Sequence, residues 1–113
     1  MSISFHGIGQ ECATFLSTTA TEGQVVKMSG RGAVGPCSAG DGFCGVAVCC
    51  RDDACSVQVG GFVTVSYTGT APAVGWTALA ADGEGGVKSV TTGGRAYLVA
   101  DADTTAKTVT IKL

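Results

Sequence analysis

The stretch Gly45–Gly69, GVAVCCRDDACSVQVGGFVTVSYTG, contains three short apolar runs separated by two tight joints. The joints are the tetrapeptide Arg51–Ala54 and the pair Gly60–Gly61, and both have the composition of turns. The runs themselves are rich in Val, Phe, Tyr and Thr, residues that favour strands. The stretch therefore predicts a three-stranded antiparallel meander.

Apolar and polar residues alternate along the second and third of these runs. In Cys55–Val59 the odd positions are apolar, whereas Ser56 and Gln58 are polar. In Phe62–Tyr67 the odd positions are again apolar, and the even positions after Phe62 are polar. A period of two predicts strands with one face in the core and the other in water.

The composition describes a tightly turned all-β domain. The chain has 113 residues, of which 18 are glycine and only 14% are charged, while 45% are hydrophobic. This length suits one domain, and a chain rich in small β-branched residues fits neither a helical bundle nor a disordered segment. We expect a single β-barrel domain over residues 11–113, preceded by an extended N-terminal arm over residues 1–10.

Seven further segments have the composition of strands and are separated by turns rich in Gly, Asp and Thr. They are Cys12–Leu16, Gln24–Ser29, Ala33–Cys37, Trp76–Ala80, Val87–Val90, Ala96–Ala100 and Lys107–Leu113. Strands so short and numerous predict a small Gly-rich β-barrel or a two-sheet sandwich of about 8–10 short antiparallel strands.

The second half of the chain resembles the first at an offset of 52 residues, which places Gly75 on Gly23. The same offset places Val109–Ile111 on Val57–Val59. The order of strands and glycine turns then occurs twice, which predicts a weak internal duplication. Phe62–Tyr67 is left without a counterpart, and we expect it to carry the chain from one half of the barrel to the other.

Charge and hydropathy disfavour two classes of partner. The net charge is −2 and the seven basic residues are scattered, so nucleic-acid binding has no electrostatic basis. No apolar run reaches the length of a membrane span, and the N-terminus MSISFHGIGQ lacks the regions of a secretion signal. We expect a protein that binds neither nucleic acid nor membrane and is made in a reducing cytoplasm.

The six cysteines, at positions 12, 37, 44, 49, 50 and 55, have three interpretations. A disulfide framework is disfavoured without a secretion signal. Cys44 with Cys49 and Cys50 with Cys55 have the C-x4-C spacing of some zinc sites, but each pair spans a strand or turn and the only His is remote, so a zinc site is disfavoured as well. Cys44, Cys50 and Cys55 share strand faces with valines, so the preferred interpretation is that they are small buried hydrophobic residues.

Candidate catalytic groups do not converge in the sequence. His6 is the only histidine and lies in the expected arm, and the adjacent Asp52 and Asp53 fit a hairpin turn better than a catalytic pair. In neither of the Gly-rich segments 40–42 and 83–86 is a glycine directly followed by the Lys-Ser/Thr of a phosphate loop, and neither precedes an expected helix. The sequence predicts no enzyme and no catalytic, metal or cofactor site, and Trp76 is expected in the core or at a subunit contact.

Four segments carry a family resemblance: Gly23–Gly30, Gly40–Val48, the long stretch Val57–Val87, and AYLVADAD followed by TVTIKL. Their rhythm of "G-V-A" strand, turn, "V-x-V-x-G" strand, Trp segment, Gly turn and terminal alternating strand resembles the small capsid decoration, or head-stabilisation, proteins of tailed bacteriophages and prophages. The resemblance implies a non-enzymatic β-barrel on the outside of a phage capsid, made in the bacterial cytoplasm.

The resemblance also implies partners and contact residues. It implies binding to the major capsid protein and a homo-oligomer, most often a trimer. The N-terminal arm would contact the capsid through Ser2, Ile3, Ser4, Phe5, His6 and Ile8. Trp76 and Tyr97 are the candidates for contacts between subunits. The alternative is a small ligand- or carbohydrate-binding β-barrel module of a phage or bacterial surface assembly, in which these two aromatic residues would line a concave pocket.

Overall fold

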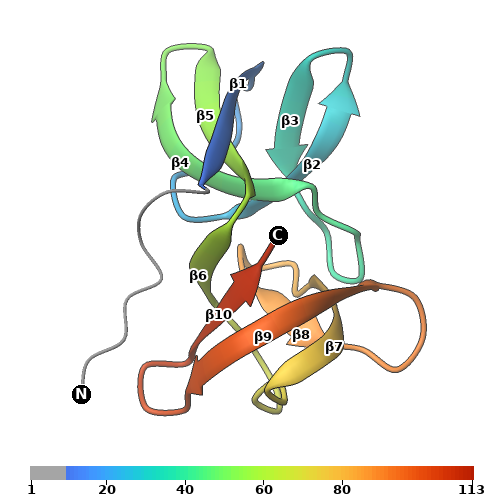
Figure 1. Cartoon of the computed structure of the whole chain (residues 1–113). Coiled ribbons are helices and arrows are strands. Elements are labelled where there is room, and N and C mark those ends of the chain that lie inside the picture. Colours follow the sequence, from blue (N-terminus) through green and yellow to red (C-terminus); the bar gives the residue numbers. More distant parts are fainter. Residues whose placement is uncertain (1–9) are drawn as a thin grey trace.

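The computed structural model describes residues 10–113, which form ten β-strands in two sheets (Figure 1). The strands are β1 (Glu11–Leu16), β2 (Val25–Gly30), β3 (Ala33–Pro36), β4 (Gly45–Arg51), β5 (Ala54–Gly60), β6 (Phe62–Ser66), β7 (Gly75–Ala81), β8 (Val87–Ser89), β9 (Arg95–Asp103) and β10 (Thr108–Lys112). The prediction of a small all-β fold of short strands is confirmed. Residues 1–9, most of the expected arm, lie outside the described residues.

The first five strands form a closed barrel in the order β1-β3-β2-β4-β5. β1 runs antiparallel to β5, from Glu11 opposite Gly60 to Leu16 opposite Ala54. Leu16 also meets Ala33 of β3 in parallel, so the barrel contains one parallel contact among its antiparallel pairs. Closure leaves this sheet without an open edge.

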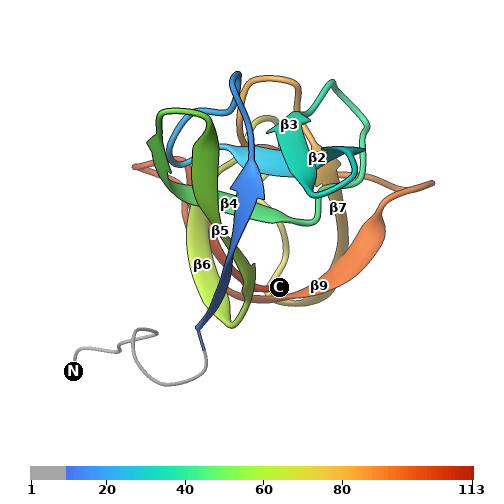
Figure 2. The ribbon, with the colours of Figure 1, turned by 90° about the horizontal axis from the view of Figure 1, so that it is seen from above.

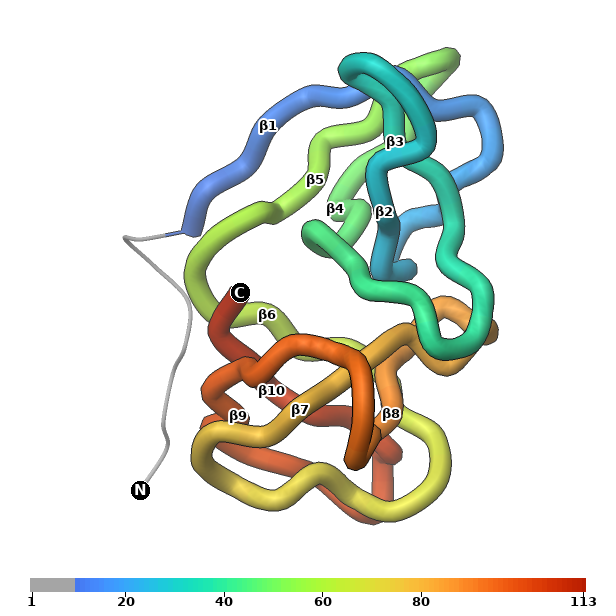
Figure 3. The backbone as a smooth tube through the Cα atoms, turned by 90° about the vertical axis from the view of Figure 1, so that its right-hand side faces the viewer, coloured from blue at the N-terminus to red at the C-terminus, as the bar shows by residue number. Residues whose placement is uncertain are grey.

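The last five strands form a second sheet in the order β6-β10-β9-β7-β8. All of its strand pairs are antiparallel. An isolated parallel bridge between Tyr67 and Val87 brings its two edges together. We call β1–β5 the first unit and β6–β10 the second unit; Figure 3 shows them as two layers, and Figure 2 looks down on the first with the second beneath it.

The two units have the same topology. Each strand of the second unit corresponds to the strand five earlier in the chain, so β6 corresponds to β1 and β10 to β5. With this correspondence, the pairing order of the second sheet reads β1-β5-β4-β2-β3, which is the order around the barrel. The parallel contact of β1 with β3 likewise matches the bridge beside β6 and β8. The expectation that Phe62–Tyr67 has no counterpart is therefore wrong. β1 is its counterpart, but β1 is mostly exposed and lacks the apolar alternation of β6.

The meander predicted over Gly45–Gly69 is also only partly correct. β4 and β5 form a hairpin, but β6 pairs with β10 in the other sheet. The chain leaves the barrel at Gly61, whose φ of +82° favours glycine. Gln58 holds this crossing, since its side-chain N–H groups donate to the carbonyls of Gly60 (3.0 Å) and Phe62 (2.8 Å). Gln58 is consequently buried, although the alternation predicts it to be exposed.

The first residues of β2 and β4 are buried on both faces, which joins the units into one body. Val26 and Ala47 point into the barrel, where they pack with Val34, Cys55 and Val57. Their neighbours Val25 and Val46 point the other way and join the core of the second unit. Successive residues of a strand point to opposite faces, so each pair of neighbouring residues contributes to two cores.

Further contacts between the units come from the loop between β3 and β4. Phe43 stacks on Tyr97 of β9 with ring centroids 4.8 Å apart. The Gly40 N–H donates to the Ala81 carbonyl at 2.8 Å, and the Ala81 N–H donates to the Asp41 carbonyl at 2.9 Å. This loop descends onto the second sheet in Figure 1.

Two cysteines form a disulfide, which corrects the interpretation of Cys50 and Cys55 as packing residues only. Cys50 and Cys55 face each other across the β4–β5 hairpin, with Cα atoms 4.1 Å apart. Cys55 is buried as expected, but the hairpin register also places the two sulfurs together. The other four cysteines are free thiols.

The disulfide generates a thiol-counting prediction. Protein denatured without reductant should show four reactive thiols and reduced protein six, as measured with Ellman's reagent. Closing so short a loop stabilises the fold by about 2 kcal/mol, so reduction should lower the free energy of unfolding by that amount. Cys50→Ala should lose the same stability and become insensitive to reductant. Six thiols before reduction would contradict the pairing.

Gly45 generates a second prediction. A Cβ at this position would lie 2.4 Å from the Gln58 carbonyl oxygen and 2.8 Å from Val57 Cγ1, so β4 and β5 would have to separate. Gly45→Ala should therefore lower the free energy of unfolding by about 1–3 kcal/mol in urea titration. Gly42→Ala is the control, because its Cβ meets nothing within 4 Å. Equal effects of the two substitutions would contradict this close approach.

Candidate interaction surface

Two large apolar side chains project from the second unit. Trp76, the second residue of β7, is 73% exposed, and Val74, which precedes the strand, is 71% exposed. Single exposed hydrophobic residues are common on proteins, but adjacent ones that form a patch indicate a contact surface.

Alternation along β7 places Trp76 outside the core. Leu79 and Ala81 point inward and are almost completely buried, so Trp76, an odd number of residues away, points outward. The Thr77 hydroxyl donates to the Ala73 carbonyl at 2.8 Å and holds the preceding loop against the strand. The loop that carries Val74 is therefore tied to the start of β7.

The apolar surface continues across the second sheet. Trp76 is directly opposite Leu98 of β9, Leu98 is opposite Lys112 of β10, and Lys112 is opposite Phe62 of β6. Residues directly opposite one another share a face of the sheet. Leu98 and Phe62 are half-buried and Lys112 is exposed. We call Val74, Trp76, Leu98 and Lys112 the Trp76 face.

Tyr97 is not part of this surface, which corrects its expected role in subunit contacts. Its side chain is 2% exposed, stacks on Phe43, and donates its hydroxyl hydrogen to the Phe43 carbonyl at 3.2 Å. Arg95 lies over the outer side of the ring, 5.1 Å from the centroid. Tyr97 therefore joins the two units of its own chain and offers no area to a second chain.

The other candidate residues remain predictions. Trp76 is exposed and therefore available for a subunit contact. The arm residues Ser2, Ile3, Ser4, Phe5, His6 and Ile8 lie outside the described residues.

Three hollows lie elsewhere on the surface. One of about 410 Å³ lies where the units meet, between Val46, Gln58, Thr64 and Thr110. A second, of about 290 Å³, lies beside Gln24 and Gly85. A third, of about 410 Å³, lies at the contact of β1 with β3, and its lining includes Leu16, Ser29, Ala33, Val34 and Asp53. Neither Trp76 nor Tyr97 lines any of the three, contrary to the expectation for a ligand-binding barrel.

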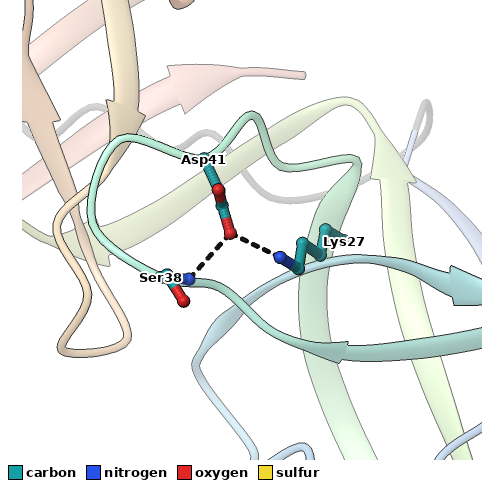
Figure 4. Close-up of polar contacts among 3 residues, drawn as sticks. All are labelled: Lys27, Ser38 and Asp41. Atoms are coloured by element: carbon teal, nitrogen blue, oxygen red, sulfur yellow. Dashed lines mark hydrogen bonds and ion pairs between the residues drawn. The ribbon is translucent and has the colours of Figure 1, made fainter.

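A charged cluster fixes the loop that joins the units (Figure 4). The Lys27 ammonium of β2 and the Ser38 N–H both donate to Asp41 Oδ2, the latter at 2.9 Å. These two hydrogen bonds hold the pKa of Asp41 below its ordinary 3.8. The bond to the Asp41 carboxylate, together with its charge, raises the pKa of Lys27 above 10.5. Both side chains are therefore charged at neutral pH.

The thiols beside this loop are poorly suited to nucleophilic chemistry. Burial, followed by the negative charge of Asp41, raises the pKa of Cys37 to about 11. Burial also raises the pKa of Cys44. The thiolate is the reactive form, so both groups are almost fully protonated and unreactive at neutral pH.

Two further searches concern the part of the chain that the structure describes. In residues 10–113 no group of three or more His, Cys, Asp or Glu side chains is placed to hold a metal ion. No helix in this part is long and apolar enough to cross a membrane.

Comparison with known proteins found no matching family model, curated protein or solved structure. Function is therefore inferred from the residues of this chain and their geometry. Two exposed apolar residues, Val74 and Leu16, were not among the candidates from sequence. For Val74 a signal exists, because an apolar residue between Pro72 and Gly75 lies in a loop, where burial is uncommon.

The Lys27–Asp41 pair generates a prediction on pH dependence. The pKa of Asp41 is lowered by folding, so the stability that it contributes is present above pH 3.8 and is lost as the pH falls through the lower folded pKa. The pKa of Lys27 is raised by folding. The stability that Lys27 contributes is therefore present below pH 10.5 and is lost as the pH rises through the higher folded pKa. Asp41→Asn should remove both dependences. The change in stability should be small, because the pair is partly exposed.

The measurement is the unfolding temperature of both proteins from pH 2 to 12. The difference between wild type and Asp41→Asn should be largest in the neutral range and shrink toward both extremes. Asp101→Asn, at an exposed carboxylate on β9, is the matched control and should show no such profile. A difference independent of pH would contradict the assigned pairing.

Proposed function

We propose that the protein is a non-enzymatic virion structural protein that binds the exterior of a phage capsid and stabilises it. The observation that carries this proposal is the Trp76 face, an exposed apolar surface on a sheet whose other side is a packed core. A rigid β-scaffold that presents an apolar face is suited to contact another protein. The rhythm of the sequence, which resembles capsid decoration proteins, supports the capsid as the site of that contact.

The arrangement of the aromatic residues favours this function over the ligand-binding alternative. A carbohydrate- or ligand-binding module needs its aromatic side chains in a concave site, where they cover the ligand. Here Trp76 projects from a sheet face, and Tyr97 is sealed in the core with its hydroxyl hydrogen-bonded. The indole is thus placed for contact with a second protein surface.

We further propose that the N-terminal arm, residues 1–10, binds the major capsid protein. An extended segment that orders on its partner covers a large area at modest affinity, and it can add a strand to an exposed sheet edge. A homo-oligomer, with the trimer as the expected form, would present several arms to neighbouring capsid subunits. Linked arms bind far more tightly than one arm alone, because the later contacts are intramolecular.

The test is co-sedimentation with undecorated capsids assembled from the major capsid protein of the phage or prophage that this proposal assigns as the source of the chain. Wild type should bind, and Ile3→Ala combined with Phe5→Ala and Ile8→Ala should bind at least about 10-fold more weakly, as expected when apolar anchors are removed. The matched control, Ser2→Ala with Ser4→Ala, should bind nearly as wild type does. The unfolding temperature should be unchanged in both variants.

Two results would overturn the proposal. Wild-type protein that does not co-sediment with the capsids has no decoration function. Retention of a sugar on a glycan array, without capsid binding, would establish the ligand-binding module instead. A large loss of thermal stability in the triple variant would show that the N-terminal residues belong to the core. That result would overturn the proposal that they form a capsid-binding arm.

A further inference from the structure

The two units of the chain contact each other through different faces. The first unit uses the outer side of β2 and β4: the Val25 N–H donates to the Gly85 carbonyl at 2.9 Å, and the Gln24 side chain lies beside Gly85. The second unit uses the end of β7 and the turn before β8, which include Ala81 and Gly85. A contact between two different faces of similar units is heterologous, and such a contact leaves one copy of each face unused.

Strand pairing and the sequence offset identify the unused faces. Val25 lies opposite Val46 on the first unit and Trp76 lies opposite Leu98 on the second, so Trp76 and Leu98 of the Trp76 face are the counterparts of Val25 and Val46. On the first unit the counterparts of Ala81 and Gly85 are Ser29 and Ala33. Both of these line the hollow of about 410 Å³ at the contact of β1 with β3. We call this hollow the β1–β3 hollow.

Both unused faces are apolar and accessible. Trp76 and Val74 are each more than 70% exposed, and Leu16 at the β1–β3 hollow is 60% exposed. In Figure 1 the start of β7 lies at the bottom of the molecule, whereas the end of β1 and the start of β3 lie at the top. One chain therefore cannot bring its own two faces together.

We infer that copies of this chain associate head to tail, with the Trp76 face of one copy seated on the β1–β3 hollow of the next. The contact repeats the packing that already joins the two units within each chain. In that packing Val25 is buried and donates its N–H to the Gly85 carbonyl, and at the corresponding positions between copies Trp76 meets the start of β3 at Ala33.

The chemistry of the two faces is complementary. Leu16, Ala33 and Val34 give the β1–β3 hollow an apolar lining, and its volume of about 410 Å³ accommodates an indole ring. Aromatic side chains that fill such a hollow dominate many protein interfaces. Lys112 lies in the same cross-strand row as Trp76, while Asp53 lines the hollow, so their opposite charges favour this orientation over a face-to-face contact of two identical surfaces.

The inference does not rest on capsid binding, and its test uses the protein alone. Trp76 is the only tryptophan, so its fluorescence reports directly on this contact. As the concentration of the wild-type protein rises, light scattering should show association, and the emission should shift to shorter wavelength as the indole leaves water.

Trp76→Glu removes the projecting residue, and Ala33→Glu fills and charges the hollow. Each variant should weaken association at least about 30-fold, the loss typical of a central interface residue. Val48→Glu is the matched control, because Val48 is 48% exposed but belongs to neither face, and it should associate as wild type does. Circular dichroism checks that each variant is folded, and Leu16→Glu replaces Ala33→Glu if the latter does not fold.

A mixing experiment separates head-to-tail from face-to-face association. Trp76→Glu keeps an intact hollow and Ala33→Glu keeps an intact Trp76 face, so an equimolar mixture should form a 1:1 dimer with a shift in Trp76 emission. A contact of two identical faces would not be restored by mixing, because each pair would still contain a damaged face.

Three outcomes would overturn the inference: wild-type protein that stays monomeric at all concentrations, a mixture that does not associate, or a Val48→Glu variant as weak as the other two. Failure of capsid binding is a separate result. A monomer that still co-sediments with capsids would overturn the head-to-tail contact and leave the decoration function standing, whereas self-association without capsid binding would do the reverse.

Discussion

The burial of the first residues of β2 and β4 on both faces is the constraint on which the rest of the structure depends. Val26 and Ala47 complete the interior of the barrel, while Val25 and Val46 complete the core of the second unit. A polar side chain at any of these positions would lose its water without a partner. Because the strands belong to both cores, the units cannot separate without exposing apolar surface, and the position of the Trp76 face relative to the barrel is fixed.

Local structure was predictable from the sequence because its signals are local. Turns rich in glycine and aspartate separate the strands, and the period of two correctly places Val65 of β6 and Val109 and Ile111 of β10 in the core. It fails at Thr110, which is also buried. Strand pairing was not predictable from the sequence, because it depends on residues far apart in the chain. The joint Gly60–Gly61 resembles a hairpin turn, but it sends β6 to the other sheet, and the buried amide of Gln58 is explained only by the carbonyls at that crossing.

The candidate site was predictable in one residue and not in its surroundings. Trp76 stands out in composition as the only tryptophan, but the sequence does not show which strands lie beside it. Leu98 and Lys112 join it through the β7–β9 and β9–β10 registers, which are set by distant pairing and by a bulge after Thr110. Tyr97 and Leu98 are neighbouring large residues on β9, and their side chains point to opposite faces of the sheet. The direction of its side chain places Tyr97 in the core.

Comparison of the two units gives physical meaning to the exposure of Trp76. Val25, which lies opposite Val46, is buried against the second unit, whereas Trp76, which lies opposite Leu98 at the corresponding position, is 73% exposed among the described residues. The indole has the larger apolar surface of the two, so its transfer from water would be the more favourable. A partner surface on the second unit would bury Trp76 as the contact between the units buries Val25.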